Sequence, residues 1–367
     1  MILMNDFKAE PAELREAMLS AARRVLESGW YVLGNEVAAF ERQWAQTCGV
    51  SHGVGVGNGM DAIEIGLRSL DIGPGDEVIT TPMTAFATVL AILRAGATPV
   101  LADIDPNSAL LSIESAQRCL SPKTKAVVLV HLYGQVRAMS AWVDFCQRAG
   151  IHLIEDCAQA HLATLQGKVA GSFGTVGAYS FYPTKNLGAL GDAGMLISNT
   201  ASLAERAARL RNYGQSVRYQ HPELGMNSRL DELQAAMLTE RIKWLQPYTE
   251  QRRQIASTYR SGITNPIVRQ MSTPEEPAAH VHHLFVVTCS QRDALQAHLH
   301  AQGIQALIHY PIPVHQQTPC RTIQRDPEGL RASEKHAAEC LSLPCHPQMT
   351  EIDVARVIAN INSFRFV

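Results

Sequence analysis

The sequence predicts an α/β protein with a mostly parallel central sheet flanked by helices. From about Gly53 to Asn199, short apolar runs alternate with segments of helical spacing, a pattern typical of a parallel sheet covered by helices. The chain has 367 residues, of which 46% are hydrophobic and 18% are charged, so it can bury a sizeable core. At roughly 150 residues per domain, this length favours about two domains.

The strands and helices of the first part follow from the position of the apolar residues. Asp61 to Leu70 has the spacing of an amphipathic helix, and glycines directly after it end the helix. Ser202 to Asn212 and Arg229 to about Ser261 are also predicted helices, and the second is expected to bridge two domains. The predicted strands are GVGV, EVITT, TPVLAD, KAVVLV, IHLIE, VGAYSF and GMLIS.

The C-terminal part is predicted to be a smaller α+β domain. We expect residues 1–250 to form the large domain with its bridging helix, and residues 251–367 to form the small domain. Its predicted strands are HLFVVTC and QALIH, and its predicted helices are 291–302, 331–341 and 350–364.

Charge and cysteine content exclude several classes of protein. There are 32 Lys plus Arg against 34 Asp plus Glu, so nothing favours nucleic-acid binding. The eight cysteines show no C-x-x-C spacing and are typical of reduced cytoplasmic thiols. The N-terminus lacks the signal-peptide pattern, and the most apolar stretch, 84–97, is too short for a membrane span. We therefore expect a cytoplasmic protein.

Polar residues that follow predicted strands are candidate site residues, because ligands of open α/β sheets lie beyond the carboxyl ends of the strands. The turn Gly57–Asp61 offers backbone N–H groups to a phosphate, although GNG is equally an ordinary turn. Asp156 ends an apolar strand, where it either pairs with a cation or caps a helix. His131 ends another strand and either binds a ligand or is structural. The histidines of 280–283 lack a second ligand group, so we expect strand-entry surface and no metal.

Lys185 is the fourth candidate and lies in SFYPTKNLGALGDAG, between two apolar runs. Partial desolvation lowers the pKa of a lysine and frees its amine to form a Schiff base, although an exposed turn lysine is the common case. A phosphate-binding turn, an acid for a pyridinium nitrogen and a downstream lysine are together what pyridoxal 5'-phosphate requires.

From near residue 5 to about residue 348, the chain resembles the DegT/DnrJ/EryC1/StrS family of sugar aminotransferases, which have the type I aminotransferase fold. The matching segments are GWYVLGNEVAAFE, GNGMDAIEIGLRSLDIGPGDEVIT, KAVVLVHLYGQ, IEDCAQAH, SFYPTKNLGALGDAG, LGMNSRLDELQAA and HYPIPVHQQ. The resemblance implies a homodimer that uses pyridoxal 5'-phosphate, with active sites shared between the subunits.

The resemblance also implies roles for single residues. Lys185 would form the Schiff base with the cofactor, Asp156 would pair with its pyridinium nitrogen, and Gln159 would lie against its ring or 3-oxygen. One departure concerns position 85, where the family usually has an aromatic residue that stacks on the ring; here it is Ala85, and Phe86 follows. The implied phosphate contacts are Gly59, Met60, Ser180 and, from the neighbouring subunit, Asn227.

The same resemblance implies L-glutamate as the amino donor and a keto nucleotide sugar as the acceptor. SFYPTKNLGALGD and HYPIPVH are typical of the 3-keto branch, which predicts amination at C3 of a dTDP-6-deoxyhexose or a UDP-hexose derivative. The alternatives are a 4-keto nucleotide sugar, a keto-cyclitol, or a non-catalytic regulator of the same fold; the intact lysine, acid and glutamine argue against the last. The expected substrate contacts are Arg229, Tyr219, His309 and Tyr310.

Overall fold

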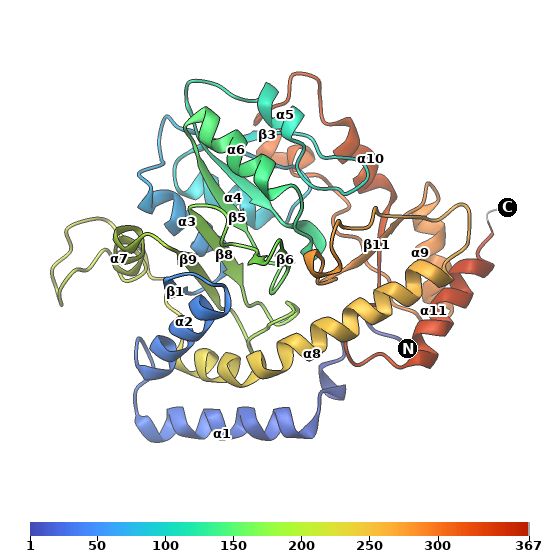
Figure 1. The fold of residues 1–367 in the computed structure, drawn as a ribbon, viewed down its shortest axis with the longest axis horizontal. Helices are drawn as coiled ribbons and strands as arrows, with labels where there is room; N and C mark the ends of the chain where they lie inside the picture. Colours follow the sequence, from blue (N-terminus) through green and yellow to red (C-terminus); the bar gives the residue numbers. More distant parts are fainter. Residues whose placement is uncertain (366–367) are drawn as a thin grey trace.

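The computed structural model describes residues 1–365 and has an α/β architecture in which helices cover both faces of a central sheet (Figure 1). The sheet has eight strands in the order β1-β9-β8-β5-β4-β2-β3-β12. The strands from β8 to β12 in this order run parallel. At the other edge, β9 pairs antiparallel with both of its neighbours, β8 and β1. The predicted class and the seven strands predicted for this sheet are confirmed. The strands are β1 (His52–Val56), β2 (Glu77–Thr80), β3 (Thr98–Leu101), β4 (Thr124–Val130), β5 (His152–Asp156), β8 (Val176–Ser180), β9 (Gly194–Ser198) and β12 (Gln324–Arg325).

Both faces of this sheet are buried. In β4, Val127 and Leu129 lie in one hydrophobic cluster, whereas Ala126 and Val128 lie in another. Strands buried on both faces read as continuous apolar runs, which is why the sequence reveals them. The first cluster contains side chains of α2 (Asn35–Thr47), α5 (Ile113–Arg118), α6 (Met139–Ala149) and α8 (Glu232–Gly262), and the second those of α3 (Gly59–Ser69), α4 (Phe86–Arg94) and α7 (Ala201–Leu210).

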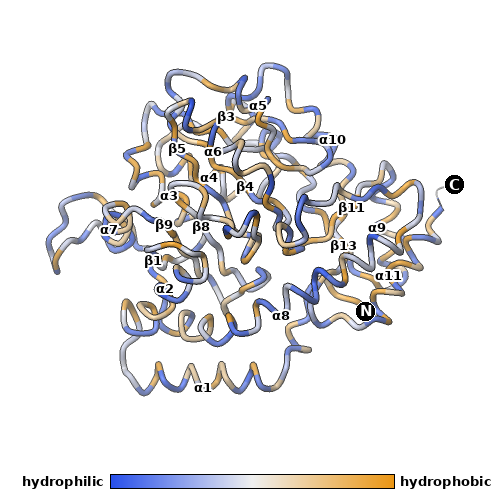
Figure 2. The backbone as a smooth tube through the Cα atoms, in the orientation of Figure 1, coloured by the Kyte–Doolittle hydropathy of each residue, from blue (hydrophilic) through white to orange (hydrophobic). Residues whose placement is uncertain are grey.

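Helix α8 joins the two cores, as predicted for a bridging helix. Leu238 and Leu245 lie in the cluster of the large sheet, and Ile255 and Tyr259 lie in the C-terminal cluster. Helix α1 (Ala12–Ser28) runs beside α8 and alternates hydrophobic and hydrophilic residues along its length (Figure 2). Its apolar face is buried against α8. In Figure 1, α1 lies along the lower edge of the molecule, below α8.

A smaller antiparallel sheet, ordered β10-β11-β13, forms the C-terminal core together with α9 and α11. The predicted strand at 305–309 is wrong, because only single bridges form, from Ile304 to Ile2 and from Leu307 to Ser342. The predicted helix 331–341 ends at Glu339, since the next residue begins β13 and pairs with β11. The elements are β10 (Arg269–Gln270), β11 (Phe285–Thr288), α9 (Arg292–Ala301), α10 (Arg331–Glu339), β13 (Cys340–Leu343) and α11 (Glu351–Ser363).

Two further features concern the predicted organisation. Residue 250 lies inside α8, and β12 pairs with β3 at the edge of the large sheet, so the division into 1–250 and 251–367 stays a prediction. His280 and His282 are buried, so the predicted surface position is wrong for them.

Within residues 1–365, no helix is both long and apolar enough to span a bilayer. The remaining short elements are β6 (Thr164–Leu165), β7 (Lys168–Val169), η1 (Phe7–Ala9), η2 (Leu132–Gly134), η3 (Pro277–Ala279), η4 (Val314–Gln316) and η5 (Thr318–Cys320).

Candidate active site

The candidate site lies at the carboxyl ends of the parallel strands β4, β5 and β8. Asp156 is the last residue of β5, Ser180 is the last residue of β8, and Lys185 follows five residues later in a turn. The backbone N–H of Lys185 donates to the carbonyl of Tyr182 at 2.8 Å, which closes this turn. Neighbouring parallel strands end at the same edge, so the topology brings these residues together.

Asp156 is buried and hydrogen-bonded. Its Oδ2 accepts from the Thr88 hydroxyl at 2.8 Å, and its Oδ1 accepts from the N–H of Ala158 at 3.1 Å. Burial raises the pKa of Asp156, while the Thr88 hydrogen bond and the nearby Lys185 charge oppose that rise. No helix begins at Asp156, so the helix-cap alternative is wrong.

Thr88 and Thr84 belong to the site although the sequence analysis did not single them out. The two hydroxyls of these buried residues lie 2.7 Å apart; Thr88 is in the first turn of α4, and Thr84 precedes this helix by two residues. Because Thr84 lies in the bend before α4, helical spacing does not place the pair, and the sequence carries no local signal for it. Their hydroxyls form a short chain that ends on the Asp156 carboxylate.

Lys185 lies in a partly enclosed environment that favours its neutral amine. Burial lowers the pKa of Lys185 from 10.5 to about 8, and the charge of Asp156 opposes that shift. The lysine charge also adds to the effect of burial on nearby histidines, lowering the pKa of His161 to about 3 and that of His309 to about 4. A positively charged Lys185 is therefore surrounded by neutral imidazoles, with Asp156 as its anionic neighbour.

The turn at the start of α3 forms a narrow cradle beside β8. Asn58 caps the helix, and its Oδ1 accepts from the N–H of Asp61 at 2.9 Å. A Cβ atom on Gly59 would lie 2.6 Å from the Cβ of Ser180, so glycine is required for this close approach. The first N–H groups of a helix have no partner within it, and here they belong to Gly59 and Met60, as a phosphate site needs.

Gln159 is held by two tyrosines. Its Oε1 accepts from the backbone N–H of Tyr133 at 2.6 Å, and its Nε2 donates to the hydroxyl of Tyr310 at 3.3 Å. The hydroxyl of Tyr133 in turn donates to the carbonyl of His309 at 2.7 Å. The structure thus brings His309 and Tyr310 next to Gln159, about 150 residues away in sequence.

Phe86 is near this group. It is the first residue of α4, directly after Ala85, and it lines a cavity of about 140 Å³ together with Thr84, Tyr310 and Ile312. Phe86 therefore shares a wall with Tyr310, whereas the Ala85 side chain adds only a methyl group.

His131 takes the structural alternative. Its Nε2 lies 2.8 Å from Oε2 of the buried Glu155, which also accepts backbone N–H groups of Gly171, Phe173 and Gly174, each at 2.8 Å. All four contacts fill the oxygens of Glu155, so this pair braces the loop before β8.

Three other predicted substrate and phosphate contacts lie between α7 and α8. Tyr219 is 79% exposed, Asn227 is exposed, and Arg229 donates to Asn212 at 3.2 Å. The segment after α7 projects from the body at the left of Figure 1, but Asn227 and Arg229 flank Ser228, whose hydroxyl accepts from the N–H of Gly57 at 2.9 Å and donates to Asp61 at 2.7 Å. Within residues 1–365, no hydrogen bond joins them to Lys185 or Gln159. Their roles stay predictions, and the predicted role of Asn227 is toward a neighbouring subunit.

The group fits pyridoxal phosphate on three observations. The pKa of Lys185 is lowered to about 8, so part of its amine is neutral near pH 7. The buried Asp156 keeps lone pairs free for a cation, and the glycine cradle admits an anion. A parallel sheet whose carboxyl edge carries such a set defines an α/β enzyme of the type I aminotransferase fold.

The comparisons with known proteins agree with this class. The chain belongs to the DegT/DnrJ/EryC1/StrS aminotransferase family, whose sequence model matches residues 12–362. It is 43% identical to a dTDP-3-amino-3,6-dideoxy-alpha-D-galactopyranose transaminase of Aneurinibacillus thermoaerophilus, over 100% of both chains. The predicted family and the prediction of an aminotransferase are confirmed.

Two solved structures are similar throughout. DesV of S. venezuelae, solved in complex with a ketimine intermediate, is 40% identical with a TM-score of 0.95, covering 98% of this chain and 97% of that one. NtdA of Bacillus subtilis, solved with bound cofactor PMP, is 28% identical with a TM-score of 0.88, covering 96% and 82%. The predicted type I aminotransferase fold is confirmed.

Proposed function

We propose that this protein is a pyridoxal 5'-phosphate-dependent transaminase that moves the amino group of L-glutamate to a keto nucleotide sugar. The observation that carries the proposal is the half-buried Lys185, whose pKa of about 8 is set by burial opposite the carboxylate of Asp156. A lysine and an acid so arranged at the carboxyl edge of a parallel sheet match the needs of Schiff-base chemistry.

Several residues of the chain would hold the cofactor. The N–H groups of Gly59 and Met60, with the Ser180 hydroxyl, would bind its phosphate, Asp156 its ring nitrogen and Gln159 its ring or 3-oxygen. When bound, pyridoxal phosphate supplies an aldehyde that forms an imine with an amine and a pyridinium ring that takes up electrons.

Lys185 acts as the base and acid of the reaction. At pH 7 and a pKa of about 8, roughly a tenth of its amine is neutral, compared with about 0.03% for an ordinary lysine. The neutral amine would accept a proton from the α-carbon of the amino donor, and the resulting ammonium would donate a proton to C4′ of the cofactor. The Thr88 hydrogen bond favours the ionised form of Asp156, which would hold a proton at the ring nitrogen.

For the acceptor, we propose C3 of a 3-keto-6-deoxyhexose nucleotide. The name of the Aneurinibacillus relative, a transaminase of a 3-amino-3,6-dideoxy sugar nucleotide, supports this position. His309 and Tyr310 lie beside Gln159, which supports the proposal that they contact the sugar. A 4-keto nucleotide sugar and a keto-cyclitol remain the alternative acceptors.

We also propose that the enzyme is a cytoplasmic homodimer. The exposure of Tyr219 and Asn227 on a projecting segment supports sites completed by a second subunit, with Arg229 at its base. The eight cysteines, all free and buried within residues 1–365, suit a reducing compartment.

The first experiment tests the cofactor linkage. Purified protein should show visible absorption that L-glutamate bleaches, and borohydride should fix the cofactor onto the peptide that contains Lys185. The Lys185→Ala variant should be colourless and inactive, whereas Lys168→Ala, at an exposed lysine, should behave like the unaltered enzyme. Turnover by Lys185→Ala would overturn the proposed mechanism.

A second experiment tests the acceptor. The enzyme is offered a 3-keto nucleotide sugar, a 4-keto nucleotide sugar and a keto-cyclitol, each with L-glutamate, and 2-oxoglutarate is measured. Turnover of the 3-keto compound alone supports C3 amination, and turnover of the 4-keto compound or the cyclitol alone refutes it.

A further inference from the structure

The segment between Tyr310 and α10 crosses the edge of the large sheet without long regular structure. It contains η4, η5 and the two-residue strand β12. Its backbone meets the sheet at a few places, where the N–H of Val314 donates to Pro82 at 3.0 Å and that of Asp326 donates to Leu101 at 2.9 Å. We name residues 311–330 the crossing segment. Because it directly follows Tyr310, it constrains the backbone at that residue.

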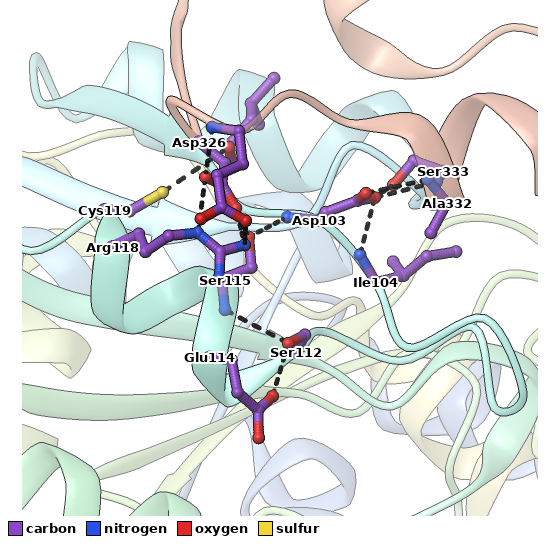
Figure 3. A network of polar contacts seen from close by, with 12 residues as sticks. Asp103, Ile104, Ser112, Glu114, Ser115, Arg118, Cys119, Asp326, Ala332 and Ser333 are labelled. Carbon is purple, nitrogen blue, oxygen red and sulfur yellow. Dashed lines mark hydrogen bonds and ion pairs between the residues drawn. The ribbon is translucent and has the colours of Figure 1, made fainter.

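A buried carboxylate holds the C-terminal end of the crossing segment (Figure 3). Asp326 is 1% exposed and accepts from the Arg118 guanidinium at 2.9 and 2.5 Å, from the Ser115 hydroxyl, and from the N–H of Glu328 at 2.9 Å. Burial alone would raise the pKa of Asp326, but these hydrogen bonds outweigh it and hold that pKa below its usual range. The carboxylate is therefore a fully bonded anion, whose removal would leave an arginine and a serine without their partner.

A second carboxylate holds the start of α10. Asp103, just after β3, accepts from the N–H groups of Ala332 and Ser333, each at 2.9 Å, and from the Ser333 hydroxyl at 2.5 Å. The N-cap residue Leu330 has no side chain able to bond these groups, so Asp103 supplies the cap from another part of the chain. A negative charge at this end of α10 is also favoured by the helix dipole.

Ser115 connects the backbone of Asp103 to the carboxylate of Asp326. Its hydroxyl accepts from the N–H of Asp103 at 2.6 Å and donates to Asp326 (Figure 3). Arg118 lies in the same short helix, α5, so α5 is bonded directly to Asp326, whereas Ser333 is bonded by Asp103, which α5 contacts through the backbone N–H of Asp103. We name Asp103, Ser115, Arg118 and Asp326 the anchor.

Helix α10 connects the anchor to the candidate site. Nε2 of its His336 lies 2.8 Å from the hydroxyl of Tyr133, and that hydroxyl donates to the carbonyl of His309 at 2.7 Å. Glu334 of α10 also contacts His315 of η4 at 3.0 Å. The contacts from α10 therefore reach both the residue before Tyr310 and the crossing segment after it.

We propose that the anchor positions His309 and Tyr310 for the acceptor half of the reaction by fixing the crossing segment and α10 to the large domain. None of its four residues touches the candidate site, so they are positioning residues. The kinetic part of this inference rests on the proposed function, whereas the anchoring itself is a property of the chain alone.

The first test measures anchoring without any assay of activity. Asp326→Asn keeps the shape of the side chain and removes its charge. The matched control is Glu328→Gln, since Glu328 also lies 3.5 Å from Arg118 but is largely exposed. Hydrogen exchange in peptides covering 309–330 and tryptic cleavage after the exposed Arg321 and Arg325 are compared.

The two variants should differ sharply. In Asp326→Asn, exchange in 309–330 and cleavage should rise by about tenfold, the loss expected for one hydrogen bond between charged groups, while peptides of β4 and β5 stay unchanged. Glu328→Gln should match the unaltered protein. Unchanged exchange in Asp326→Asn, or an equal increase over the whole chain, overturns the proposal.

The second test separates positioning from a general structural effect. In Asp326→Asn, the KM for the acceptor sugar should rise by about tenfold, while the half-reaction with the amino donor stays within about twofold. Equal loss in both halves overturns the positioning role. If Asp326→Asn does not fold, Ser115→Ala, which deletes one hydroxyl, takes its place with the same expected direction. If the unaltered protein transaminates no acceptor, the proposed function fails, and exchange and proteolysis decide the anchoring.

Discussion

Replacing Thr88 by valine removes the hydroxyl that donates to Asp156 and keeps nearly the same volume. The hydrogen bond is 2.8 Å long and buried, and it is one of two that the carboxylate accepts. Hydrogen bonds to charged groups contribute about 1.5–3 kcal/mol, so its loss should lower kcat/KM by about 10- to 150-fold. The pKa of Asp156, already raised by burial, should rise further, because a donor that favours the ionised form is gone.

The assay is the pH dependence of kcat/KM. Since the active form needs an ionised Asp156, the acid limb of the profile should move to higher pH in Thr88→Val. The control is Thr249→Val, because Thr249 is equally buried and donates at 2.8 Å, but to the carbonyl of Leu245 inside α8. Thr88→Val also leaves the Thr84 hydroxyl without its partner. The free energy of unfolding is therefore measured for Thr88→Val and for the double variant Thr84→Val/Thr88→Val, in which that hydroxyl is removed as well.

Two results would refute this reasoning. The first is a kcat/KM for Thr88→Val within twofold of the unaltered enzyme at every pH. The second is a loss of activity that the control reproduces, since the effect would then follow from lost stability rather than from the charge of Asp156.

Three further outcomes are expected. In cofactor-free protein, reductive labelling of Lys185 by an aldehyde should have a midpoint near pH 8, because its pKa is about 8; peptide mass spectrometry with N-acetyl-lysine as reference checks this, and a midpoint two units higher would contradict it. Gly59→Ala should lower stability by about 1–3 kcal/mol and weaken cofactor retention, because its Cβ would lie 2.6 Å from that of Ser180. In the control Gly191→Ala, the new Cβ would lie 3.4 Å from its nearest neighbour, so neither effect is expected. Thermal melts measure the stability, and absorption spectra measure the retained cofactor. The lowered pKa of Asp326 means stability that is present above pH 4 and lost as the pH falls below it, so Asp326→Asn should flatten the acid limb of a pH series of unfolding curves; an unchanged slope would contradict this.

The fold could be predicted wherever burial produces a recognisable run of apolar residues in the sequence. Strands such as β4 are covered on both faces, so nearly every residue of KAVVLV is apolar and the run is visible in sequence. The segment QALIH is also apolar at its centre, but it forms only a single bridge, from Leu307 to Ser342, and the carbonyl of its His309 accepts from the Tyr133 hydroxyl instead. Composition records burial and does not record whether a partner strand is available.

The candidate site divides in the same way. Lys185, Asp156 and Gln159 were found because each follows a recognisable strand or motif, and the structure gathers them at one edge. Thr88 could not be assigned, since its hydroxyl matters only because α4 packs where that hydroxyl meets a carboxylate 68 residues away.

The sequence by itself determined the α/β class, the family and the identity of the central lysine and acid, because these depend on local apolar patterns and on motifs within short stretches of chain. Only the tertiary structure decided that His309 and Tyr310 lie beside Gln159, and that Asp103 and Asp326 hold the segment next to them. The physical reason is that a hydrogen bond between residues some 150 to 230 positions apart depends on how helices and strands pack, and no local spacing encodes it.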